Sequence, residues 1–86
     1  SNVTIIDVRE EEEQPVSDDF VRIVIPLTDL PEREDEIPKE GDVYMICMTG
    51  GRSSNAIAYL ASKGWGNLIN VEGGTLGYFD IKKQMQ

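Results

Sequence analysis

The sequence contains no histidine and a single cysteine, Cys47. Without histidine, Ser-His-Asp and Cys-His catalysis are excluded, and so is every metal site that needs imidazole. One cysteine forms no disulfide within the chain, and a small domain without disulfides is typical of a reducing compartment. We therefore expect a cytoplasmic protein without a metal or other cofactor, in which any nucleophile is activated without imidazole.

Positive charge and long apolar runs are also scarce. The chain has 8 Lys and Arg against 16 Asp and Glu, a formal net charge of −8. Such an acidic protein repels nucleic acid and anionic membrane surfaces. No apolar run approaches the roughly 20 residues that span a bilayer, and no signal peptide is visible. We expect neither nucleic acid nor a membrane among its partners.

The length and the remaining composition suit one small folded domain. The chain has 86 residues, of which 40% are hydrophobic and 28% are charged, as in ordinary globular proteins. We expect a single domain over residues 1–86. Ser1 and Asn2 resemble the remnant of an expression tag and are given no structural weight. Nothing in the sequence indicates an oligomeric state.

Short runs of β-branched residues alternate with helix-compatible segments. The expected strands cover residues 3–6, 21–27, 43–47 and 68–71. The expected helices cover residues 28–38, 52–63 and 75–83, the first of them capped by Thr28, and residues 10–13 are a polar, helix-tolerant stretch. This alternation predicts an α/β domain with a mostly parallel sheet and helices on its faces.

The chemistry-bearing segment begins at Cys47, at the expected carboxyl end of a buried strand, where sites form in parallel sheets. Gly50 and Gly51 follow and allow backbone N–H groups to turn inward around an anion. The next helix adds positive potential at its N-terminus, and Arg52 places a guanidinium at the rim. Together these groups predict a lowered thiol pKa. The alternative is that Cys47 is simply a buried apolar residue.

Residues 47–53, C-M-T-G-G-R-S, resemble the active-site loop of rhodanese-like domains, whose common form is C-R-S-G-x-R-S. Further motifs follow the order of that family: D-V-R-E at 7–10, I-P-L at 25–27, G-W at 64–65 and N-V-E-G-G at 70–74. The resemblance extends over about residues 3–80. It implies a three-layer α/β/α fold with a small, mostly parallel sheet of about four strands, in which the first strand and helix of the family are missing.

The resemblance also implies an activity, sulfurtransferase, and its residues. Cys47 would carry a sulfane sulfur from thiosulfate or a persulfide donor to a thiol or protein acceptor. Arg52 would support the loop and the bound sulfur species. The substrate-binding and anion-binding loop would consist of Met48, Thr49, Gly50, Gly51, Arg52 and Ser53.

Three departures from the family pattern affect these expectations. Met48 stands where the family often has Arg or Lys, which weakens the expected binding of small dianions such as thiosulfate. The family's H-I-x-G-A segment is replaced by residues 17–22, so the loop there must differ. Tyr78 replaces the usual tryptophan, and we expect it to be an aromatic residue of the core.

Two other functions remain as alternatives. In the first, the domain is a non-enzymatic binding or regulatory module on the same scaffold, and the retention of both Cys47 and Arg52 argues against it. A cysteine phosphatase or arsenate reductase is disfavoured, because those sites use C-x5-R whereas the spacing here is C-x4-R.

Several charged residues outside the loop are expected to be structural. Asp7 should accept backbone N–H groups, and Arg9 should pair with a carboxylate. The acidic stretch 10–13 could dock a basic partner protein, but solvated surface is the default interpretation of both this stretch and 32–36. Glu72 is left open between a site residue and a structural one.

Overall fold

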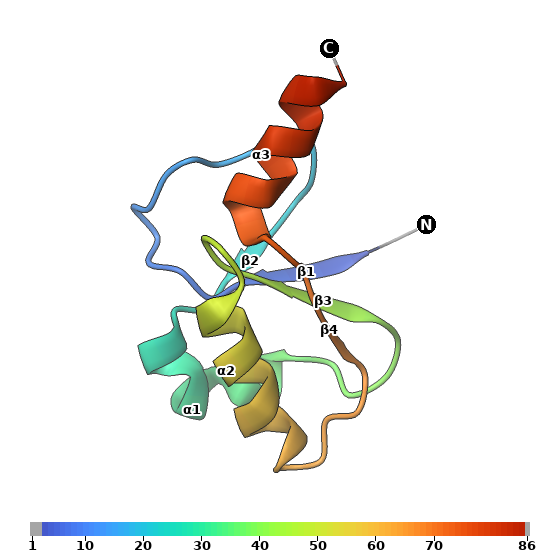
Figure 1. Ribbon diagram of the computed structural model, residues 1–86. Helices are drawn as coiled ribbons and strands as arrows, with labels where there is room; N and C mark the ends of the chain where they lie inside the picture. Colours follow the sequence, from blue (N-terminus) through green and yellow to red (C-terminus); the bar gives the residue numbers. More distant parts are fainter. Residues whose placement is uncertain (1–2, 86) are drawn as a thin grey trace.

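The protein is described by a computed structural model covering residues 3–85, so Ser1 and Asn2, interpreted above as a tag remnant, lie outside it. The chain forms one sheet of four parallel strands in the order β2-β1-β3-β4 (Figure 1). The strands are β1 (Thr4–Asp7), β2 (Ile23–Val24), β3 (Val43–Ile46) and β4 (Leu68–Asn70). The predicted α/β class with a small parallel sheet is confirmed.

The register of the sheet brings the strand ends together. Asp7 pairs with Ile46 across β1 and β3, and Met45 pairs with Asn70 across β3 and β4. The carboxyl ends of these strands therefore meet at one edge of the sheet, from which the Cys47 segment continues.

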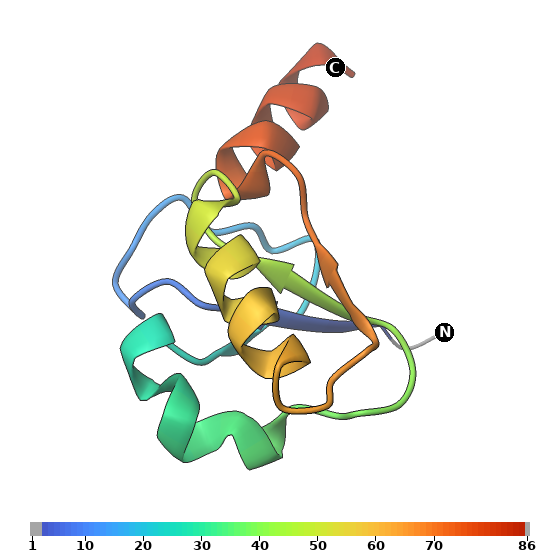
Figure 2. The ribbon, with the colours of Figure 1, turned by 60° about the horizontal axis from the view of Figure 1, so that its bottom comes forward.

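Helices lie on both sides of the sheet. The helices are α1 (Leu30–Arg33), α2 (Gly51–Ala61) and α3 (Gly74–Gln84). The 3-10 turns η1 (Leu27–Asp29) and η2 (Glu34–Glu36) flank α1. Helices α1 and α2 cover one side, whereas α3 stands on the other (Figures 1 and 2). The sheet and helices therefore form the three layers that were expected.

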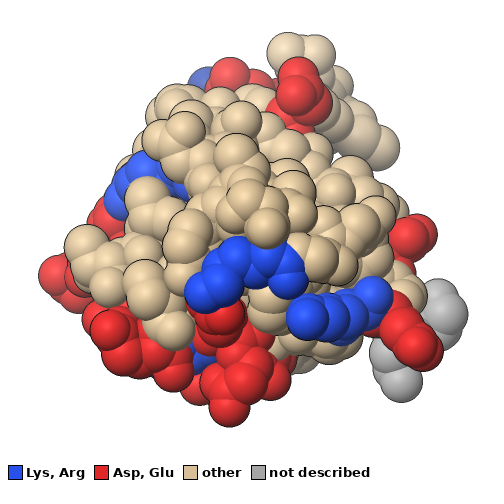
Figure 3. Space-filling view, turned by 90° about the horizontal axis from the view of Figure 1, so that it is seen from below, with Lys and Arg blue, Asp and Glu red and all other residues tan. Residues whose placement is uncertain are grey.

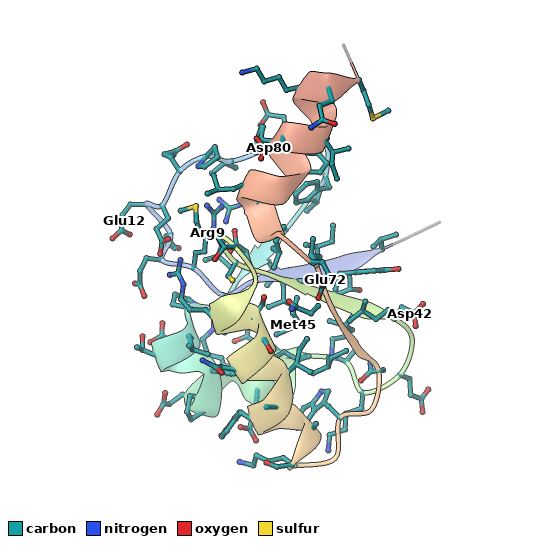
Figure 4. All side chains as sticks on the ribbon, viewed as in Figure 1. Arg9, Glu12, Asp42, Met45, Glu72 and Asp80 are labelled. Carbon is teal, nitrogen blue, oxygen red and sulfur yellow. The ribbon has the colours of Figure 1, made fainter. Side chains whose placement is uncertain are left out.

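The hydrophobic core lies between the sheet and the pair α1 and α2. It is closed by Trp65, whose Nε1 donates to the Ile37 carbonyl at 3.1 Å. Met45 of β3 is fully buried in this layer (Figure 4). The buried cluster comprises Ile6, Val8, Ile25, Leu30, Ile37, Val43, Met45, Cys47, Ala56, Leu60 and Trp65.

The opposite face of the sheet is only partly covered. A pocket of about 290 Å³ is lined by Val3, Ile5, Phe20, Tyr44, Ile46, Val71 and Tyr78. Tyr78 of α3 meets Phe20 edge to face at 5.5 Å, and its hydroxyl donates to Asp19. The prediction that Tyr78 belongs to the core is wrong, because its ring is half-buried at the edge of this pocket.

Two predicted elements differ from the observed ones. The strand expected over 21–27 is regular only at Ile23–Val24, because Pro26 has no N–H for the ladder. Ile25 and Leu27 still donate to the Asp7 and Val8 carbonyls at 2.9 and 3.0 Å. The helix expected over 28–38 is split into η1, α1 and η2, and Thr28 does not cap it, since Asp29 holds the N-cap position of α1.

Residues 10–13 form a turn and no helix. The Glu13 N–H donates to the Glu10 carbonyl at 3.1 Å. In return, the Glu10 N–H donates to Glu13 Oε2 at 2.8 Å. The turn is thus closed at both ends and fixes the direction of the Glu13 side chain.

Over residues 3–85, no helix is both long enough and apolar enough to cross a membrane. The same residues contain no group of three or more His, Cys, Asp or Glu side chains arranged to hold a metal ion.

Candidate active site

Cys47 directly follows β3 and precedes the turn into α2. The residue exposes only 1% of its surface. Gly50 is the N-cap of α2 and has a φ of +111°, a left-handed conformation that residues with a Cβ rarely adopt. The strand end and the helix start are therefore joined by a short turn that brings the N–H of the N-cap residue Gly50 toward the sulfur.

Two donor groups lie within hydrogen-bonding distance of the Cys47 sulfur. The Gly50 N–H donates to Sγ at 3.0 Å, and the Ser53 hydroxyl lies 3.4 Å from it. Burial raises the pKa of the Cys47 thiol, but hydrogen bonds from the Ser53 hydroxyl and from the backbone N–H groups of Ser53, Gly50 and Thr49 outweigh it. The pKa is therefore lowered, and the thiolate is favoured.

Asn70, at the end of β4, ties this loop to the neighbouring strand. Its Oδ1 accepts from the Ser53 hydroxyl at 2.5 Å, and its Nδ2 donates to the Gly50 carbonyl at 3.3 Å. The sequence placed Asn70 in a family motif without giving it a role in the site. The signal was its position at the carboxyl end of a strand expected in the same sheet.

The N-terminus of α3 is hydrogen-bonded to the same loop. The Thr75 N–H and hydroxyl both donate to the Cys47 carbonyl, at 2.8 and 3.1 Å, and the Leu76 N–H donates to the Met48 carbonyl at 3.1 Å. These bonds satisfy amides that have no partner within a helix. They need Gly74, because a Cβ there would lie 2.5 Å from the Cys47 carbonyl oxygen.

The guanidinium of Arg52 is bonded to a carboxylate. Its two terminal nitrogens donate to Glu13 at 2.7 and 2.8 Å. The Glu13 carboxylate is the main cause of the raised pKa of Arg52, and the negative charge of Cys47 contributes less. Reading the 10–13 stretch as solvated surface is therefore wrong for Glu13, which is half-buried against the loop.

The other loop residues have fewer contacts. Met48 is half-buried, Thr49 is exposed, and Gly51 is the first residue of α2. Glu72 is exposed at the turn before α3.

Asp7 and Arg9 are structural, as the sequence predicted. Asp7 accepts the Arg9 N–H at 3.0 Å and the Arg9 guanidinium at 3.0–3.2 Å. Arg22 adds a third partner at 2.8 Å. Both Asp7 and Arg9 are almost fully buried, and Figure 4 shows Arg9 close to the loop that follows β3. These contacts hold the segment that follows β1 against the start of β2.

The comparisons with known proteins agree with this geometry. Residues 1–80 match the profile of the Rhodanese-like domain. The chain belongs to the rhodanese-like family. A sulfurtransferase of Allochromatium vinosum is 35% identical over 79 residues, which cover 90% of this chain and 72% of that protein. Membership of this family and its sulfurtransferase relatives point to sulfur transfer in general.

Solved structures show the same fold. A rhodanese-related protein from Thermoplasma volcanium is 30% identical, with a TM-score of 0.77, and the match covers 91% of this chain and 77% of that one. A NAD-dependent persulfide reductase from A. fulgidus is 39% identical over 84% of this rhodanese-like chain, with a TM-score of 0.70. There the matched part is 13% of a much longer protein.

Proposed function

We propose that this chain is a sulfurtransferase that carries a sulfane sulfur as a persulfide on Cys47. The observation that carries the proposal is the pair of donors at the sulfur, the Gly50 N–H at 3.0 Å and the Ser53 hydroxyl at 3.4 Å. Donors placed around an anion stabilise a thiolate without a general base, which suits a chain without histidine. A bound persulfide anion would gain from the same donors.

The reaction has two steps. The Cys47 thiolate attacks the sulfane sulfur of the donor, a new S–S bond forms, and the S–S bond of the donor breaks. Thiosulfate would leave as sulfite, and an organic persulfide would leave as its thiolate. An acceptor thiolate then attacks the outer sulfur of the Cys47 persulfide, takes that sulfur as its own persulfide and releases the Cys47 thiolate. No net oxidation or reduction occurs, because the sulfane sulfur is passed on unchanged.

Intact mass measurement tests this proposal directly. The protein is incubated with thiosulfate or with an organic persulfide, and the expected product is an adduct of one sulfur atom. Cyanide or dithiothreitol should remove the adduct, and Cys47→Ser should never form it. Because Cys47 is the only cysteine, no other thiol in the chain confuses the result.

Two other outcomes would each contradict the proposal. If none of the sulfane donors gives an adduct on a folded protein, the domain is a binding or regulatory module. If the protein hydrolyses an aryl phosphate and loses this activity in Cys47→Ser, the site is a phosphatase.

A further inference from the structure

The cation expected at the rim of the site is already paired. Arg52 Nη1 and Nη2 donate to the two oxygens of Glu13 at 2.7 and 2.8 Å, a two-point contact between planar groups. Such contacts are among the stronger ion pairs of proteins. The side chains are partly shielded from water, with 39% of Arg52 and 23% of Glu13 exposed. A negatively charged donor that approaches this guanidinium must compete with a carboxylate.

Glu13 is held in this position by its own turn. Its Oε2 also accepts the Glu10 N–H at 2.8 Å, and its N–H donates to the Glu10 carbonyl. Hydrogen bonds from Arg52 and from the Glu10 backbone lower the pKa of Glu13 to about 2. The carboxylate is therefore fully charged at neutral pH, and it needs no rearrangement to reach Arg52.

The loop offers no other cation to replace Arg52. Met48 follows the cysteine, and residues 49–51 carry no charge. The nearby Arg9 and Arg22 share the single carboxylate of Asp7, so these three groups together keep one net positive charge outside the loop. Within the loop itself, the arginine of the family is therefore the cation that a donor could meet, and Glu13 occupies it.

We infer that Glu13 is a specificity-determining residue, which discriminates against dianionic sulfur donors such as thiosulfate by occupying Arg52 and so favours monoanionic donors such as organic persulfides and thiosulfonates. This inference rests on the proposed sulfurtransferase function. It concerns the choice of donor only, since the Gly50 and Ser53 groups at the sulfur do not depend on the Glu13 pair.

Two donors of the same chemistry and different charge test the inference. Thiosulfate carries two negative charges and leaves as sulfite, whereas benzenethiosulfonate carries one and leaves as benzenesulfinate. The kcat/KM of each is measured with dithiothreitol as the acceptor, by release of sulfide. Glu13→Gln should raise the ratio of thiosulfate to benzenethiosulfonate about tenfold, as expected when one full charge is removed near a charged substrate.

Glu12→Gln is the matched control. It removes the same unit of charge from the same turn, but the Glu12 side chain is exposed and points outward (Figure 4). It should change the ratio by less than about twofold, because exposed charges are screened by solvent. The double variant Arg52→Gln with Glu13→Gln should not show the higher ratio of the Glu13→Gln variant, because Glu13 acts on the donor through Arg52.

The outcomes separate the inference from the proposed function. If benzenethiosulfonate leaves a one-sulfur adduct on Cys47 but Glu13→Gln does not change the ratio, the inference is wrong and sulfur transfer stands. An equal change in Glu12→Gln would also overturn it, because net charge alone would then be the cause. If no donor forms an adduct on any folded variant, the proposed function itself fails. Glu13→Ala provides a second variant should Glu13→Gln melt at a lower temperature than the wild type.

Discussion

At the scale of single residues, the pKa of Cys47 depends in part on which acceptor receives the hydrogen of the Ser53 hydroxyl. Ser53 lies within reach of three acceptors: Cys47 Sγ at 3.4 Å, the Gly50 carbonyl at 3.3 Å and Asn70 Oδ1 at 2.5 Å. A hydroxyl has only one hydrogen to donate. The distances favour Asn70 in the resting site, and a negative charge on the sulfur competes for the same hydrogen.

Ser53→Ala tests the contribution of this hydroxyl. The variant removes the side-chain hydrogen bond that lowers the pKa of Cys47 most strongly. The pKa should rise, and the alkylation rate at neutral pH should fall about tenfold, as expected for the loss of one hydrogen bond to a charged group. The measurement is the rate of iodoacetamide alkylation against pH, and Ser54→Ala, exposed on the same helix, is the control. An unchanged pH profile would show that the backbone N–H groups alone hold the thiolate.

Asn70 variants should act on the thiol in opposite directions. Asn70→Ala removes the acceptor that competes for the Ser53 hydrogen, so the pKa of Cys47 should fall further. Asn70→Asp keeps an acceptor there and adds a negative charge, so the pKa should rise. Both variants lose the bond to the Gly50 carbonyl, worth about 1 kcal/mol, so a difference between them does not come from the loss of that bond. Alkylation profiles that coincide would contradict this role.

At the scale of elements, the site is the place where β3 ends and where α2 and α3 begin. The N–H of Gly50, the N-cap of α2, donates to the sulfur, whereas the N–H groups of Thr75 and Leu76 in α3 donate to the carbonyls of Cys47 and Met48. N–H groups that have no partner within their own helix, at the starts of two helices, therefore hold the two sides of one loop. The loop keeps its shape because Gly74 lets α3 approach it closely.

Gly74→Ala tests this close approach. The new Cβ would lie 2.5 and 2.6 Å from the carbonyl oxygens of Cys47 and Met48, and the residue has a φ of +60°. The clash and the strained backbone should lower the free energy of unfolding by about 2 kcal/mol or more. Gly66→Ala is the control, because nothing lies within 4 Å of its Cβ position. Urea denaturation of both variants measures the effect, and equal midpoints would show that α3 can shift without cost.

At the scale of the whole molecule, negative charge predominates. The net charge is −8. Seen from the side of α1 and α2, acidic side chains gather over one part of the surface, and basic side chains lie beside them (Figure 3). The three residues of η2, which are Glu34, Asp35 and Glu36, contribute acidic side chains to this helical layer. Anionic donors therefore approach a molecule of the same sign.

Salt should consequently favour the reaction with thiosulfate. Raising the ionic strength from about 0.01 M to about 0.15 M shortens the screening length from about 30 to about 8 Å, which weakens repulsion over the surface. The kcat/KM for thiosulfate should rise severalfold, and that for benzenethiosulfonate should rise less. Steady-state kinetics in potassium chloride measure both. A fall in kcat/KM with salt would show that positive potential at the site outweighs the net charge.

The elements that the sequence predicted well are those with strong local patterns. The strand before Cys47 and the helix after it are found within one residue of their expected starts, because an apolar run, glycines and helical spacing coincide there. The segment 21–38 was predicted less well. There Pro26 and a run of acidic residues interrupt regular structure, so tertiary packing decides where each short element begins and ends.

The sequence by itself determined the family, the α/β order, the position of Cys47 and the loop around it, because each depends on residues close together in the chain. Only the tertiary structure decided which residues complete the site. Glu13 reaches Arg52 across 39 residues, and Asn70 reaches Ser53 across 17. Such contacts depend on the parallel strand order, which brings distant strand ends and loops to one edge of the sheet. The sequence shows that Arg52 is present, but only the tertiary structure shows that Glu13 pairs with it.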